Sequence, residues 1–238
     1  MSAAHTASLA SLQARLGHEF RQPFLLQNAV THSSYSTDNP GTENNQRLEF
    51  LGDAILQILI AEALYSAYPE AREGLLTKRR ALLVNRDFLA GLAQEIGADT
   101  CMRFGKSEAQ NGGREKPSAL SDAFEAIVAA LYLDSDFPTV RRIVLATYGD
   151  IAVRLSTIED GANPKGKLQE LIHPVHGNAA LRYETTNTGG PAHACAYTST
   201  VFLLDRKLGA GEGTSKKQAE EAAARVALIA LRDSTPNP

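Results

Sequence analysis

Two pairs of acidic residues lie within apolar stretches of this 238-residue sequence. The first pair is Glu49 and Asp53, in RLEFLGDAIL at residues 47–56. In a helix, a four-residue spacing places both carboxylates on one face, about one turn apart. The second pair, Asp122 and Glu125, is three residues apart and would also share a helical face. Burying like charges side by side is unfavourable unless something positive lies between them.

Four such carboxylates favour a bound cation. A single internal acid is more often a satisfied core residue, bonded to a backbone amide or an Arg. Four converging carboxylates cannot all stay ionised in a core without cations, and ligation by oxygen alone suits Mg²⁺ or Mn²⁺ rather than zinc. We therefore expect Glu49, Asp53, Asp122 and Glu125 to hold Mg²⁺, with Mn²⁺ able to substitute and no small-molecule cofactor.

Helices must position these acids. Apolar residues three and four apart, in Ala- and Leu-rich segments, predict an all-helical domain over residues 1–156. The polar stretch TIEDGAN predicts a linker at residues 157–162. Residues 163–232 read as a helix, alternating strands and an Ala-rich helix, which predicts a small α+β domain of order α-β-β-β-α. Residues 233–238 are expected to be a disordered tail.

Composition indicates a soluble globular protein from a reducing compartment. Hydrophobic residues make up 43% of the chain, an ordinary share for such a protein. Cys101 and Cys195 lie far apart, which argues against a disulfide framework or a thiolate metal site. The N-terminus lacks a basic segment followed by a long apolar core, and we expect no segment of membrane-spanning length. We therefore expect a cytoplasmic protein with no membrane partner.

The net charge of −3 is divided unevenly along the chain. From residue 163 onward there are nine Lys and Arg against seven Asp and Glu, a net +2. The preceding part has 15 against 20, a net −5. This asymmetry suggests an acidic, metal-loaded first domain and a mildly basic second domain.

The motifs around the acids resemble those of the ribonuclease III family. NQRLEFLGDAIL is similar to the family signature and GGREKPSALSDAFEAIVAALYLD to its second catalytic block, while THSSY and EGLLTKRRALLVN are in family register. The resemblance implies an all-helical endonuclease domain that works as a homodimer. It also implies that the metal-binding carboxylates are Glu49, Asp53, Asp122 and Glu125.

Three residues fall at the edge of the site that this resemblance implies. Gln46 stands where the family usually has Glu, and Glu73 is the acid of the EGLLTKRRA block. Lys116 directly precedes the second catalytic helix and could contact phosphate, although a solvated surface Lys is an equal alternative.

Phe50 and Gly52 are candidates for the dimer interface. A Gly inside a helix costs roughly 1 kcal/mol relative to Ala, which is easier to understand if another backbone approaches closely. We expect that backbone to belong to the partner; the alternative is a helix of the same subunit. Phe50 could insert into the partner or fill its own core.

The C-terminal part resembles a double-stranded-RNA-binding domain through NPKGKLQELI, GGPAHACAYTSTVFL and GEGTSKKQAEEAAA. Lys216 and Lys217 would lie in the first turn of a helix, where positive charge opposes the helix dipole unless a phosphate binds. The alternative is that these lysines are merely solvated. By resemblance, Gln169, Glu170 and His193 would contact the minor groove of the RNA duplex.

We therefore predict a Mg²⁺-dependent endoribonuclease that cleaves double-stranded RNA to 5′-phosphate and 3′-hydroxyl ends, processing ribosomal RNA precursors and other structured transcripts. One alternative is a catalytically silent regulator that binds double-stranded RNA, against which the four carboxylates argue. Another is an all-helical nucleotide pyrophosphohydrolase, which leaves the pattern after residue 163 unexplained.

Overall fold

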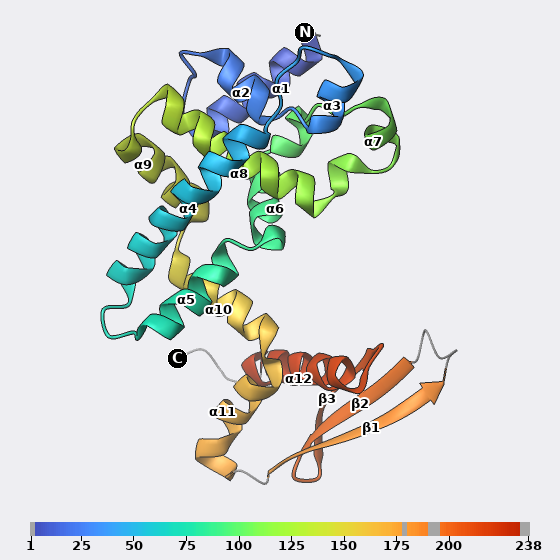
Figure 1. Ribbon diagram of the computed structural model, residues 1–238. Coiled ribbons are helices and arrows are strands. Elements are labelled where there is room, and N and C mark those ends of the chain that lie inside the picture. The colour runs from blue at the N-terminus through green and yellow to red at the C-terminus, as the bar shows by residue number, and fades with distance from the viewer. Residues whose placement is uncertain (1–2, 178–179, 190–195, 234–238) are drawn as a thin grey trace. The chain divides into compact units, whose positions relative to one another are not determined.

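The computed structural model describes residues 3–177, 180–189 and 196–233, and it divides into two compact units, Met1–Leu155 and Ser156–Pro238. The first unit is helical (Figure 1). Its helices are α1 (Ala3–Leu16), α2 (Pro23–Ala29), α3 (Ser33–Asp38), α4 (Gln46–Ala67), α5 (Glu73–Leu83), α6 (Arg86–Glu95), α7 (Lys106–Gln110), α8 (Pro117–Asp134) and α9 (Phe137–Tyr148), with short 3-10 helices η1 (Ala98–Cys101) and η2 (Gly113–Glu115). Helix α10 (Ile151–Ala162) begins in this unit and ends in the second.

Helix α8 is the central helix of the first unit and packs against α2, α4, α6 and α9 (Figure 1). Pro117 occupies its first turn, where a missing N–H removes no helical hydrogen bond. Small buried residues such as Ala123, Ala126 and Ala130 let neighbouring helices come close. The closest approach is at Gly52 of α4, where an added Cβ would lie 1.8 Å from the backbone oxygen of Glu125.

Hydrogen bonds connect the end of α8 to the chain segment that precedes α2. Asp134 is 1% exposed, and its carboxylate accepts hydrogen bonds from the backbone N–H groups of Arg21 and Gln22 and from His18 Nε2. Burial alone would raise the pKa of Asp134, but these hydrogen bonds outweigh it and the pKa is lowered. The ionised carboxylate therefore stabilises this junction.

Among the described residues, one helix is long and apolar enough to cross a membrane by length and composition. It is α4. The expectation that no segment reaches membrane-spanning length is therefore wrong. Buried residues such as Ile55, Leu59 and Ile60 account for much of this hydropathy, and core helices of soluble proteins pass the same test.

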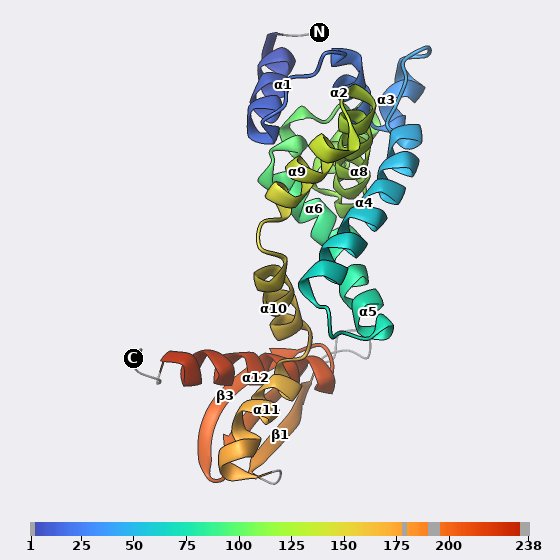
Figure 2. The same cartoon turned by 90° about the vertical axis from the view of Figure 1, so that its left-hand side faces the viewer.

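The second unit has the predicted α-β-β-β-α order. Helix α11 (Pro164–His176) precedes β1 (Leu181–Gly189), β2 (Ala196–Leu203) and β3 (Arg206–Gly213), and α12 (Lys216–Asp233) follows them. The strands form one antiparallel sheet in the order β1-β2-β3. Helix α12 contacts all three strands and α11 packs beside it (Figure 2).

Glycines in β3 allow α12 to lie close to the sheet. A Cβ at Gly209 would be 2.6 Å from the backbone oxygen of Ala223, and one at Gly211 would be 2.4 Å from the Ala223 nitrogen. The core between sheet and helices is made by Leu168, Ile172, Ala180, Val201, Leu208, Ala223, Ala224, Ala227 and Leu228.

The stretch predicted as a linker, residues 157–162, is helical and forms the second half of α10. Asp150 directly precedes the helix and caps it, because its side chain accepts hydrogen bonds from the N–H groups of Ala152 and Val153. A polar composition fits a solvated helix as well as a loop, and the role of this segment as a linker stays a prediction. The domain boundaries at 1–156 and 163–232 stay predictions. Of the predicted tail, Asp233 ends α12 and residues 234–238 lie outside the described residues.

Candidate functional site

Helices α4 and α8 bring the two acidic pairs together. Glu49 and Asp53 are one turn apart on α4, and Asp122 and Glu125 lie on α8. The close contact between Gly52 and the backbone of Glu125 holds the helices together beside all four side chains. Each carboxylate therefore lies within electrostatic reach of acids on the facing helix.

The acids lie at the rim of the helix pair rather than in the core. Asp53 is exposed, and Glu49, Asp122 and Glu125 are half-buried. The expectation that the first pair is buried is therefore wrong for Asp53. Gly52 and its apolar neighbours occupy the inner side of α4, which leaves the carboxylates where solvent and substrate can reach them.

Burial and mutual repulsion disfavour the ionised carboxylates. Burial, followed by the charges of Asp53, Glu49 and Asp122, raises the pKa of Glu125 to about 7. Burial and the charges of Asp122 and Asp53 raise the pKa of Glu49. Burial also raises the pKa of Asp122, which a hydrogen bond from Ser121 only partly offsets. The cluster is therefore short of positive charge.

The donor set fits a hard divalent cation in type and charge. All four groups are carboxylates on a rigid helix pair, and Mg²⁺ prefers oxygen ligands. The side chains do not form a coordination sphere as they stand: in the described part of the chain, no three Asp, Glu, His or Cys side chains converge enough to hold an ion. Asp53 Oδ1 instead accepts a hydrogen bond from Gln57 Nε2 at 3.2 Å. Rotation about side-chain torsions is therefore required for ligation.

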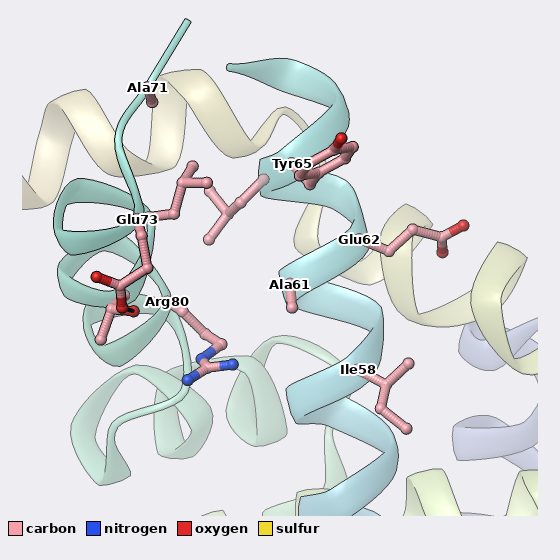
Figure 3. Close-up of a pocket in the computed structure, with 10 residues that line it drawn as sticks. Ile58, Ala61, Glu62, Tyr65, Ala71, Glu73 and Arg80 are labelled. Carbon is pink, nitrogen blue, oxygen red and sulfur yellow. Dashed lines mark hydrogen bonds between the residues drawn. The ribbon is translucent and has the colours of Figure 1, made fainter. Parts of the chain in front are cut away.

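Gln46 and Glu73 line two different pockets. Glu73 lines a pocket of about 710 Å³ between α4 and α5, where its Oε1 accepts a hydrogen bond from Thr77 Oγ1 at 2.9 Å. Figure 3 shows Glu73 and Arg80 of α5 and Ile58 and Tyr65 of α4 around it. Gln46 lines another pocket, together with Phe24, Leu25, Asn28, Glu43, Asn44, Arg47, Leu48, Leu51 and Leu133. Within one chain, these two edge residues are not brought together.

Lys116 is engaged in an ion pair. Its Nζ lies 2.6 Å from Glu108 Oε1 of α7, and Lys116 is the residue that precedes α8. The side chain is 46% exposed, so it is neither buried nor simply solvated. The pair lies beside the start of the helix that carries Asp122 and is neutral overall.

His32 and Arg86 are neighbours of the acidic cluster that were not predicted from the sequence. Both lower the pKa of Asp122, although by less than burial raises it. His32 caps the N-terminus of α3, where its Nδ1 accepts a hydrogen bond from the N–H of Ser34. The motif THSSY contains His32 and was the sequence signal from which it could have been predicted.

The close neighbour of Gly52 is α8 of the same chain, so the expectation that it marks the subunit contact is not supported. Phe50 is 82% exposed, which excludes the alternative that it fills its own core. Ile58 and Tyr65, further along α4, are 59% and 75% exposed. Together these side chains form a largely apolar, solvent-facing side of α4.

In the second unit, the candidate RNA contacts are exposed. Gln169 and Glu170 are exposed on α11, and Lys216 and Lys217 are exposed in the first turn of α12. Ser215 caps that helix, with its Oγ accepting a hydrogen bond from the N–H of Gln218 at 3.2 Å. His193 lies outside the described residues.

Comparisons with known proteins match both units. A family model described as ribonuclease-III-like matches residues 22–150, and a model of the double-stranded RNA binding motif matches residues 164–231. A protein named Ribonuclease 3 from Bdellovibrio bacteriovorus is 40% identical over 220 residues, which cover 92% of this chain and 94% of the relative. Another Ribonuclease 3, from Symbiobacterium thermophilum, is 44% identical over 216 residues, 90% of each chain.

A solved structure is similar to the first unit. The nuclease domain of ribonuclease III from Campylobacter jejuni is 39% identical, with a TM-score of 0.56. The match covers 58% of this chain and 94% of that one. The name of that structure refers to flexibility in a region involved in dimer formation.

Proposed function

The chain belongs to the ribonuclease III family and is a double-stranded-RNA endonuclease, and we propose that it cuts with Mg²⁺ held by Glu49, Asp53, Asp122 and Glu125. The observation that carries this proposal is the cluster of four carboxylates that two closely packed helices bring together, with the pKa of Glu125 raised to about 7 as a consequence. A site at the protein surface whose negative charge exceeds the positive charge of its neighbours is suited to bind a cation.

When bound, Mg²⁺ would lower the pKa of an attacking water and stabilise the charge that develops on the leaving 3′ oxygen. The chain itself positions the metal-binding carboxylates, because α4 and α8 fix the two acidic pairs on either side of the Gly52 contact. Water attacks the phosphorus and the bond to the 3′ oxygen breaks, so we expect 5′-phosphate and 3′-hydroxyl ends. Lys116 at the start of α8 is paired with Glu108, and the pair is neutral overall, so it does not replace a cation at the cluster.

We also propose that the enzyme is a homodimer. The support is the exposed apolar side of α4, because Phe50, Ile58 and Tyr65 would be costly to leave in water. Replacement of Phe50 by Glu should shift the protein toward monomer, and the variant should still unfold in one cooperative transition, because the side chain contributes little to the core. Sedimentation equilibrium and a thermal melt measure the two effects separately.

The second unit binds double-stranded RNA, and we propose specific contacts for it. The positive end of α12 with Lys216 and Lys217 would hold phosphates, and Gln169 and Glu170 of α11 would reach the minor groove. Such contacts read the shape and sugar of the duplex rather than base sequence. His193 is proposed as a further minor-groove contact.

The cellular substrates that we propose are ribosomal RNA precursors and other structured transcripts in the cytoplasm. A perfect RNA duplex should be cut by the purified chain in Mg²⁺ and left intact in EDTA, and end analysis should find 5′-phosphates. Binding without cleavage in Mg²⁺ would instead support a silent RNA-binding regulator.

A further inference from the structure

A partly buried polar network joins α11 and α12 to the sheet of the second unit. Glu220 of α12 lies at its centre, with Oε2 2.5 Å from Lys165 Nζ of α11. Its Oε1 accepts a hydrogen bond from Thr185 Oγ1 of β1 at 3.2 Å. Thr185 Oγ1 is also 2.9 Å from Ser199 Oγ of β2. Because a hydroxyl has one hydrogen, Thr185 donates to Glu220 and accepts from Ser199, which is fully buried.

The ammonium of Lys165 is held on two sides. Its Nζ lies 4.7 Å from the centre of the Tyr183 ring, in addition to its contact with Glu220. The Glu220 side chain is only 13% exposed, and Lys165 is 38% exposed. Burial and the charge of Glu220 raise the pKa of Tyr183 to about 12, so its hydroxyl stays neutral. An ion pair this enclosed restrains its partners more than a surface pair does.

The network connects the starts of the two helices that carry the proposed RNA contacts. Lys165 is in the first turn of α11, four residues before Gln169. Glu220 is one turn after Lys216 in α12. We propose that Glu220 is a positioning residue for duplex binding, which through Lys165 fixes the start of α11 against the start of α12. It thereby sets the separation between the minor-groove residues and the phosphate site. This inference rests on the RNA contacts proposed above.

A positioning role and simple electrostatics predict opposite changes in RNA affinity when the charge of Glu220 is removed. A carboxylate one turn from Lys216 repels phosphate, so removing its charge should tighten RNA binding if nothing else changes. If Glu220 positions α11, Glu220→Gln should weaken binding instead, because Lys165 loses its partner and the start of α11 is released. We expect the affinity to fall at least about fivefold, within the range typical of coupling between contacting groups.

The test uses the full-length chain and a fluorescent RNA duplex in EDTA, so that binding is measured without cleavage. Glu221→Gln is the matched control, since Glu221 is the next residue and its carboxylate is 3.9 Å from Lys217 rather than paired with α11. We expect this control to bind equally or more tightly. In a double-mutant cycle, Lys165→Met and Glu220→Gln together should cost no more than the larger single effect, because both act through one contact.

Cleavage kinetics in Mg²⁺ give a second measurement. Glu220→Gln should raise KM and leave kcat at saturating duplex unchanged, since the carboxylate cluster of the first unit is untouched. Wild-type or tighter binding by a Glu220→Gln variant with a normal melting curve would overturn the proposal, as would additive losses in the cycle.

If Glu220→Gln does not fold, Lys165→Met tests the same contact from α11. We expect weaker binding of RNA with an unchanged slope of log affinity against log salt concentration, because Lys165 is paired with Glu220 rather than with phosphate. A slope lowered by about one, or unchanged affinity, would refute the positioning role. The phosphate site is tested independently: a Lys216→Ala, Lys217→Ala variant that binds like wild type would refute that site, whatever Glu220→Gln does.

Discussion

Replacing Glu125 with Gln should stabilise the metal-free protein and nearly abolish cleavage. The pKa of Glu125 in the fold is about 7, above its ordinary value of 4.5. The folded protein therefore keeps a proton that the unfolded chain releases, so metal-free stability falls as pH rises from about 4.5 to 7. At 1.36 kcal/mol per pKa unit, the full shift corresponds to about 3 kcal/mol, and solvent screening of this half-buried group reduces the loss above pH 7 to roughly 1 to 3 kcal/mol. Gln has the same shape and avoids this loss.

At pH 8 in EDTA, the variant should melt roughly 2 to 12 °C above wild type, given the size of the first unit. Near pH 4 the difference should vanish, because Glu125 is then neutral in both states. Mg²⁺ should raise the melting temperature of wild type more than that of the variant. Cleavage should fall at least about a hundredfold, while duplex binding through the second unit stays intact.

Glu62→Gln is the matched control. Glu62 also lies on α4, but its Oε2 pairs with Arg141 Nε at 2.8 Å and both side chains are well exposed. Its loss should change stability by less than about 1 kcal/mol. The reasoning fails if Glu125→Gln cuts at close to the normal rate, or if its melting temperature at pH 8 equals that of wild type.

The remaining predictions address the metal, the RNA contacts, the first unit alone and its helix junction. Ca²⁺ should support duplex binding with little cleavage, since its longer and looser coordination holds the attacking water poorly; rapid turnover in Ca²⁺ would count against the mechanism. Replacing Lys216 and Lys217 with Ala should lower the slope of log affinity against log salt by roughly 1 to 2 for two unrelated duplexes alike. A loss confined to one duplex sequence would contradict it. A chain that ends near Glu159 should still dimerise and cut at low salt, with reduced affinity; an inactive but folded dimer would refute this division of labour. Asp134→Asn should destabilise the protein by about 2 to 4 kcal/mol at pH 7, because a buried charged acceptor of several hydrogen bonds is lost. Since the pKa of Asp134 is lowered in the fold, this difference should shrink as pH falls below about 4, and urea titrations across pH would reveal a pH-independent difference if the reasoning is wrong.

Local spacing was enough to predict much of the fold and the composition of the candidate site. The four-residue and three-residue separations of the acids placed each pair on one helical face, and alternation predicted the strands of the second unit. These features depend on neighbours within one element. Composition could not distinguish the solvated end of α10 from a loop, because both are polar.

Long-range contacts could not be predicted in this way. A Gly in α4 indicated that a backbone must approach, but not that this backbone is Glu125 of the same chain rather than a partner's helix. Lys165 and Glu220 are 55 residues apart, and no local sequence pattern around either residue predicts that the two side chains pair. The same holds for His32 and Arg86, which reach Asp122 only through the tertiary packing.

The contact at Gly52 limits how this enzyme can be engineered. Replacing a helical Gly by Ala is a common way to gain about 1 kcal/mol of stability, since Ala has the higher helix propensity. Here the added methyl carbon would lie 1.8 Å from a backbone oxygen that no side-chain rotation can move. Relief requires α4 and α8 to separate, and that separation would pull the two acidic pairs apart. A screen for thermostable variants should therefore recover few substitutions at position 52, and those it recovers should be poor nucleases.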